Sequence, residues 1–218
     1  MKTIIEHIKS ELFDSWFGLV FILFGLTIQY VTYQITESSL LSLISGSSGV
    51  ISVVLCSQRK FAFYLFGWIQ LITYVILAYE QKLYGELIEN GFYAIMMIWG
   101  MFVWTKNYNR EDNEVFIKEL TPMQLFNTII TMVGSMAILL IILTYTDDTQ
   151  PFMDTVTTVP AFIAQIMLTL RYREQWIFWF IIDVGSIIMW SIAGDYCLAA
   201  QFVFWTLNCI YGFYKWSN

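Results

Sequence analysis

Charged residues are scarce in this sequence. Asp, Glu, Lys and Arg make up 13% of the 218 residues, whereas a soluble domain carries about 25%. Hydrophobic residues make up 58%, aromatic residues alone make up 18%, and the mean hydropathy is +0.63. This balance is not that of a soluble core and predicts an all-α integral membrane protein.

Residues that build metal and redox sites are almost missing. His7 is the only histidine, which excludes a histidine cluster as a catalytic base or metal site. Cys56, Cys197 and Cys209 lack a CxxC or zinc-like spacing, and we interpret them as small core residues. No basic block suggests nucleic acid. We expect no metal, no cofactor and no nucleic-acid partner.

The N-terminal segment 1–14 does not have the pattern of a cleavable signal peptide. Charges recur throughout it, and no short apolar run precedes a small-residue cleavage site. Its apolar residues, from Ile4 to Phe13, recur at helical spacing. We expect an amphipathic helix on the membrane surface.

Eight apolar stretches lie between polar breaks, and each is close to the roughly 20 residues that cross a bilayer. We predict eight transmembrane helices at 15–34, 39–57, 61–80, 84–105, 123–145, 152–170, 175–193 and 196–216. The polar segment 106–122 then forms a loop between the fourth and fifth spans.

The basic residues predict the orientation. Ten of the 11 lysines and arginines fall in the N-terminal segment, in alternate loops and at the C-terminus. Only Lys82 falls on the other side, with the acidic loops. The positive-inside rule places both termini in the cytoplasm, and eight crossings return the chain to the same side.

The two halves of the chain match when they are shifted by 112 positions. WGMFVWT (99–105) then lies on YGFYKWS (211–217). Six identical pairs share this register: Arg59 and Arg171, Tyr84 and Tyr196, Phe92 and Phe204, Ile98 and Ile210, Gly100 and Gly212, and Trp104 and Trp216. The offset covers four spans, so the copies have the same orientation. Such parallel repeats occur in transporters, whose sites lie near the midplane between the copies.

Several polar residues fall at one depth in the predicted spans. With a rise of about 1.5 Å per residue, Asp183, Asn208 and Gln70 lie at similar heights, and Tyr74, Asn90 and Tyr93 lie somewhat higher. Trp176, Trp179 and Asp183 follow helical spacing in one stripe, and Gln201, Trp205 and Asn208 follow it in another.

Each of these residues also has an ordinary structural interpretation. Trp176 could belong to the interfacial aromatic belt, Tyr74 could be packing, and Asn208 could join helices. Asp183 could be a buried hydrogen-bond partner. Together, however, aromatic faces beside amide and carboxylate groups suit a flat, polar, cationic solute. The residues therefore predict a transporter of a small aromatic molecule.

Three motifs resemble the PnuC family of bacterial vitamin transporters. WIFW (176–179) is similar to the family's WxxW motif, and NCIYGFYKW (208–216) is similar to its closing motif. WGMFVW (99–104) fits the same pattern in the first half. The resemblance implies a fold like that of the SWEET sugar transporters. Two parallel three-helix bundles (39–105 and 152–216) would flank linker helix 123–145, with 15–34 as an extra N-terminal helix.

The resemblance also implies a function. It implies facilitated diffusion of nicotinamide riboside through the bacterial inner membrane, trapping by a cytosolic kinase, and a homotrimer in membrane lipid. It assigns Trp176, Trp179 and Asn208 to the substrate. Asp183 stands where nicotinamide riboside members commonly have asparagine, so thiamine or another nucleoside is the alternative cargo.

Two other classes of protein could share an aromatic cavity. An intramembrane enzyme would need a nucleophile with its base or a set of metal ligands, and the spans contain no histidine, no paired aspartates and no HExxH. We therefore expect no enzyme. A membrane receptor could bind the same solute without moving it, and uptake into proteoliposomes separates these classes.

Overall fold

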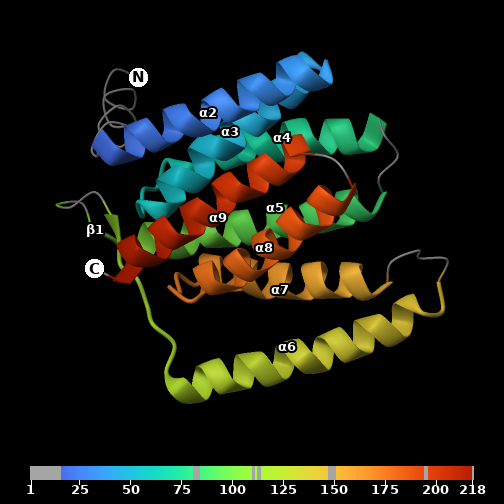
Figure 1. Ribbon diagram of the computed structural model, residues 1–218. Helices are drawn as coiled ribbons and strands as arrows, with labels where there is room; N and C mark the ends of the chain where they lie inside the picture. The colour runs from blue at the N-terminus through green and yellow to red at the C-terminus, as the bar shows by residue number, and fades with distance from the viewer. Residues whose placement is uncertain are drawn as a thin grey trace.

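The computed structural model describes residues 16–80, 84–109, 111, 114–146, 151–193 and 196–217. The side chains of 84–86, 88, 153, 154, 189, 190, 193 and 196–198 are outside this description. The predicted amphipathic segment 1–14 also lies outside the described residues. The elements below are labelled as in Figure 1.

The described residues form eight α-helices and one pair of short strands. The helices are α2 (Trp16–Thr36), α3 (Leu40–Ser57), α4 (Phe63–Glu80), α5 (Tyr84–Lys106), α6 (Pro122–Leu143), α7 (Pro151–Thr169), α8 (Gln175–Ala193) and α9 (Tyr196–Ser217). Between α5 and α6, strands β1 (Tyr108–Asn109) and β2 (Glu114–Val115) pair antiparallel. All long elements are therefore helical, as the sequence predicts.

Four of the described helices are long and apolar enough to cross a bilayer on composition alone, namely α2, α3, α4 and α6. In α8 and α9, polar side chains such as Asp183 and Asn208 interrupt the apolar face. Both of these side chains are buried, and the described part of α8 also holds an apolar helical stretch, Gln175–Ile188, which is shorter than the other four.

The repeat is visible in the turns that end α3 and α7. Arg59 and Arg171, which are 112 residues apart, both have a left-handed backbone, with φ of 63° and 67°. The N–H of Arg59 donates to the Cys56 carbonyl at 3.0 Å, and the N–H of Lys60 donates to the Leu55 carbonyl at 3.0 Å. The corresponding bonds after α7 measure 3.0 and 2.8 Å. Both helices thus end in the same Schellman motif.

The contacts between helices divide the bundle into two groups that correspond to the two copies of the repeat. In the first copy α3 packs on α4 and α4 on α5, and in the second copy α7 packs on α8 and α8 on α9. The copies meet along two seams, α3 with α9 and α5 with α7. Helix α2 covers the first seam by packing on α3 and α9. Helix α6 packs on α7 at the edge of the bundle, and none of its residues is buried.

One end of the bundle carries the α3–α4, α5–α6 and α7–α8 loops and the C-terminus. We call it the basic end, because its loops hold Arg59, Lys60, Lys118, Arg171 and Arg173. The segment that follows β2 crosses this end and is bonded to both copies. It runs into α6, whose first turn is closed by a capping box between Thr121 and Gln124.

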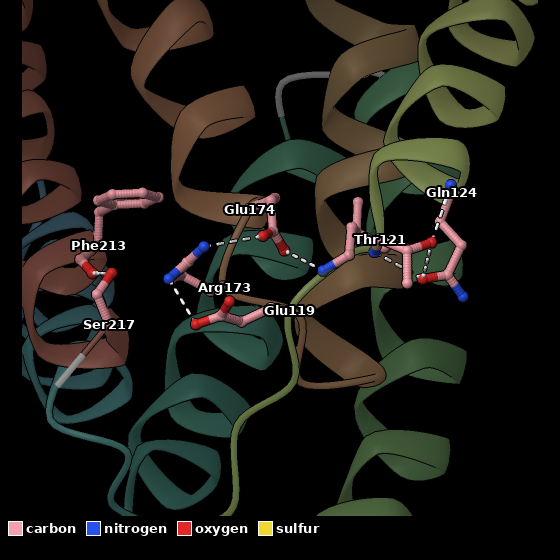
Figure 2. A network of polar contacts seen from close by, with 8 residues as sticks. Glu119, Thr121, Gln124, Arg173, Glu174, Phe213 and Ser217 are labelled. Carbon is pink, nitrogen blue, oxygen red and sulfur yellow. Dashed lines mark hydrogen bonds and ion pairs between the residues drawn. The ribbon is translucent and has the colours of Figure 1, made fainter.

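A polar network joins this segment to α8 (Figure 2). Arg173 Nη1 pairs with Glu119 Oε1 at 2.6 Å, and its Nη2 pairs with Glu174 Oε1 at 3.4 Å. Glu174 Oε2 also accepts the N–H of Leu120 at 3.1 Å. The start of α8 is therefore tied to the chain that leads into α6.

Candidate functional site

A cavity of about 430 Å³ lies between the two copies. Its walls come from α4 and α5 of the first copy and from α8 and α9 of the second, and α3 and α7 complete it. This volume is within the usual range for small-molecule sites, about 300–1,000 Å³. The position between the copies is the one that a parallel repeat predicts.

All ten residues predicted from the sequence line this cavity. They are Gln70 and Tyr74 on α4, Asn90 and Tyr93 on α5, Trp176, Trp179 and Asp183 on α8, and Gln201, Trp205 and Asn208 on α9. The structure therefore brings four separate stretches of sequence to one space. That these side chains bind a substrate stays a prediction.

Asp183 lies in the wall and is only 6% exposed. Its Oδ2 accepts a hydrogen bond from Cys209 Sγ at 3.3 Å. A thiol is a weak donor, so this bond offsets little of the cost of holding a carboxylate inside a membrane bundle. A cationic ligand would offset more of it, because the opposite charges attract strongly away from bulk water.

Four buried polar atoms of cavity-lining residues have no hydrogen-bond partner among the described residues. They are Nε1 of Trp176, Oδ1 of Asn208, and Nε2 and Oε1 of Gln175. The other half of the Asn208 amide is engaged, since Nδ2 donates to the Val53 carbonyl at 3.4 Å. An unpartnered buried polar group costs about 1–3 kcal/mol. Such groups in a ligand-sized cavity favour a ligand that offers both a donor and an acceptor.

Gln70 reaches the cavity because α3 has a glycine opposite it. A Cβ added at Gly49 would lie 2.8 Å from the Gln70 side-chain nitrogen. Helices α3 and α4 therefore pack closely at this level, as small residues allow in membranes. The Ser- and Gly-rich sequence of α3 has this packing role.

Glu89 is a cavity residue that is not among the ten predicted from the sequence. The position falls near the outer end of its span, where solvation explains a carboxylate. In the structure it lines the cavity and accepts a hydrogen bond from the Tyr93 hydroxyl at 2.5 Å. The repeat could have found it, because Glu89 and the predicted Gln201 are 112 residues apart.

Cys56, Cys209, Gln165 and Gln175 also line the cavity and were not predicted. The cysteines were interpreted as core residues, and both are indeed buried. Gln165 is the equivalent of Val53 in the repeat, and both line the cavity.

The charged side chains that line the cavity are acidic. Among the described residues its lining contains two carboxylates, those of Glu89 and Asp183, and no lysine, arginine or histidine. No group of three His, Cys, Asp or Glu residues in the described part of the chain could hold a metal ion. The cavity therefore suits a cationic or neutral molecule and disfavours an anionic one.

Comparison with known proteins gives a consistent picture. Residues 39–218 match the family model described as nicotinamide mononucleotide transporter. The chain is 31% identical to the nicotinamide riboside transporter PnuC of Neisseria mucosa over 96% of this chain and 85% of that protein. It is 30% identical to the protein of the same name from Haemophilus influenzae, over 99% of this chain and 97% of that one.

A solved structure is also similar. A crystal structure of the vitamin B3 transporter PnuC matches with a TM-score of 0.80 and 30% identity, covering 96% of this chain and 94% of the other. Both the sequence and the three-dimensional arrangement are thus shared along nearly the whole chain.

Proposed function

Because the chain belongs to the nicotinamide mononucleotide transporter family, which includes the PnuC vitamin transporters, we propose that it carries nicotinamide riboside. Proteins of this family are transporters, so the chain is a multi-pass membrane transporter and not an enzyme. The relatives are named for the riboside and the family model for the mononucleotide, and the two differ by one phosphate.

The charge of the cavity decides between these two substrates. A phosphate in such a site is normally held by arginine, lysine or backbone N–H groups. Here no basic side chain lines the cavity among the described residues, and two carboxylates do. The mononucleotide would meet repulsion, whereas the cationic pyridinium ring of the riboside gains from Asp183. This is the observation that carries the proposed substrate.

The ten cavity residues predicted from the sequence are our proposed binding residues. The indoles of α8 and α9 would stack on the ring, with Asp183 as its fixed counter-charge. Amides and phenols from α4 and α5 would bind the ribose hydroxyls. Asn208 Oδ1 and Trp176 Nε1 support this proposal, because a ligand would give each of them a partner.

We propose an architecture of eight membrane spans in a SWEET-like 3+1+3 arrangement. Helices α3–α5 and α7–α9 would be the parallel bundles, α6 the linker and α2 the extra helix. The matching turns after α3 and α7 support the repeat. The basic loops support a cytoplasmic basic end in the bacterial inner membrane, with both termini inside.

Facilitated diffusion with cytosolic phosphorylation is the proposed mode of transport. The substrate would flow down its gradient, and a kinase would then add the phosphate that the cavity disfavours. We also propose a homotrimer. The exposed apolar side chains of α6, which has no buried residue, support a contact with lipid or with another subunit.

A thermal-shift screen of the purified protein tests the substrate. We expect stabilisation by nicotinamide riboside and none by nicotinamide mononucleotide, riboflavin or deoxynucleosides. Thiamine is the informative competitor, because its thiazolium ring also carries a positive charge. Stabilisation by thiamine alone, or by the mononucleotide, would contradict the proposed substrate.

A further inference from the structure

Two tryptophans bond the copies to each other at the basic end. Trp104 Nε1, on α5 of the first copy, donates to the carbonyl of Leu168 on α7 at 3.2 Å. Trp216 Nε1, on α9 of the second copy, donates to the carbonyl of Cys56 on α3 at 3.1 Å. Both pairs are related by the 112-residue offset, so each copy gives the other the same bond.

The two acceptor carbonyls occupy the same place in the two Schellman motifs. The Cys56 carbonyl already accepts the N–H of Arg59, and the Leu168 carbonyl accepts that of Arg171, each at 3.0 Å. A carbonyl has two lone pairs, and the indole fills the second one. The last carbonyls of a helix carry partial negative charge, which makes them good acceptors for an indole N–H.

The indole rings fill the space between the cavity and the basic end. Trp104 and Trp216 are 0% and 3% exposed, and their ring centroids lie 6.0 Å apart. Trp216 also meets Trp176 edge-on at 5.6 Å, and Trp176 lines the cavity. The bonded pair is thus in direct contact with the proposed substrate site.

Strand β2 and the segment that follows it tie the same two turns together. The N–H of Val115 donates to the Arg59 carbonyl at 3.2 Å, and the N–H of Lys118 donates to the Arg171 carbonyl at 2.8 Å. A movement of one copy against the other that separates these two turns must therefore move this segment as well. The two Schellman turns are held at a fixed spacing while the basic end is closed.

We propose that Trp104 and Trp216 form a latch that holds the basic end closed and that its two bonds break together when the site opens toward that end. The inference rests on the proposed transport function. Since the bonds are equivalent under the repeat, one rotation of the copies against each other breaks both. Trp104 and Trp216 are positioning residues, because they act on the relative placement of the copies.

Cysteine labelling from either side of the membrane tests the latch. The parent has its three native cysteines replaced by alanine and carries Leu71→Cys, which places a thiol in the cavity wall. A membrane-impermeant maleimide is added without substrate to right-side-out and to inside-out vesicles. Proteolysis of a C-terminal tag identifies the vesicles that expose the basic end.

We expect Trp104→Phe and Trp216→Phe each to raise labelling from the basic end about threefold to tenfold. Labelling from the opposite end should fall, because each molecule that opens toward the basic end is no longer open toward the other end. Phenylalanine keeps one aromatic ring and removes the N–H donor together with part of the indole volume, a loss that the control variant below shares. Each variant tests the latch independently, and a variant that does not reach the membrane is replaced by its tyrosine counterpart.

Trp68→Phe is the matched control. Trp68 Nε1 donates to Met101 Sδ at 3.4 Å within the first copy, so its loss should leave labelling from both ends unchanged. Unchanged labelling in the latch variants, an equal rise from both ends, or the same shift in Trp68→Phe would overturn the proposal. The labelling needs no substrate, so failure of nicotinamide riboside to bind would leave this result readable.

Discussion

Asp183 is the cavity residue whose charge bears most directly on which ligand can bind. It is a buried carboxylate that accepts a hydrogen bond from the thiol of Cys209. Two roles fit such a group, a counter-charge for a cationic substrate and a structural hydrogen-bond acceptor. The two roles predict different effects of a neutral substitution at this position. Only the counter-charge role makes the loss of binding affinity depend on the charge of the ligand.

Asp183→Asn should weaken binding of nicotinamide riboside about tenfold, equivalent to about 1.4 kcal/mol. This is below the ~4 kcal/mol of a charge pair 4 Å apart at an effective dielectric constant of 20, because desolvation offsets part of the attraction. The reduced riboside, which is neutral and of similar shape, should bind nearly as before. Calorimetric titration of both ligands measures the difference.

Cys209→Ala is the control for this substitution, because it removes the thiol donor and keeps the charge. It should preserve the preference for the cationic ligand. Equal losses for the cationic and the neutral riboside in Asp183→Asn would assign the aspartate a structural role instead.

Trp179→Ala should reduce affinity for nicotinamide riboside roughly tenfold to a hundredfold, since stacking of a base on an aromatic side chain contributes about 1–3 kcal/mol. Trp179 lines the cavity, whereas Trp99 on α5 is 44% exposed on the outside of the bundle. Trp99→Ala removes the same indole from the surface and should bind normally. Unchanged affinity in Trp179→Ala would remove that residue from the site.

At the scale of helices, two equivalent glycines set how closely α4 and α5, and α8 and α9, approach. A Cβ at Gly100 would collide with the Tyr64 side chain, and one at Gly212 would collide with the indole of Trp176. Close packing at small residues is a common way to join helices in a membrane. In this chain the second contact also fixes the position of a cavity residue.

Gly212→Ala should therefore displace Trp176 and lower both thermal stability and substrate affinity. Overpacking a dense interior costs about 1–3 kcal/mol. Gly134→Ala on α6 is the matched control, since nothing lies within 4 Å of an added Cβ there and alanine favours helix by about 1 kcal/mol. Its stability should be unchanged or slightly higher. Equal melting temperatures for the two variants would contradict the steric account.

At the scale of the whole molecule, the proposed mode of transport makes a prediction about gradients. Uptake of labelled nicotinamide riboside into proteoliposomes should stop when the inside concentration equals the outside concentration. An inward pH gradient should change neither the rate nor the final level, because a fixed counter-charge carries no proton across. Enclosing ATP and a riboside kinase should make uptake continue.

The position of Glu89 in the cavity gives this test a second informative outcome. The proposed mode of transport takes Asp183 as a fixed counter-charge, yet a second carboxylate, that of Glu89, lines the same cavity. Accumulation driven by the pH gradient would therefore assign the two carboxylates to a proton relay. In that case Glu89→Gln should abolish the effect of the gradient and keep downhill uptake.

Much of this protein is determined by its sequence alone. Low charge and long apolar stretches determine an all-helical membrane protein, because backbone groups in lipid must bond within their own helix. The 112-residue repeat determines two like copies. Stripes at helical spacing identified ten cavity residues, since polar groups at one depth of a bundle satisfy one another or a ligand.

Only the tertiary structure decided which residues meet across the copies. Three features depend on contacts between different helices. They are the reciprocal bonds of Trp104 and Trp216, the place of Glu89 in the cavity, and the hydrogen bond from Cys209 to Asp183. Periodicity along one helix gives the face and depth of a side chain. The neighbour opposite that face depends on how the helices pack, and packing is a property of the folded bundle.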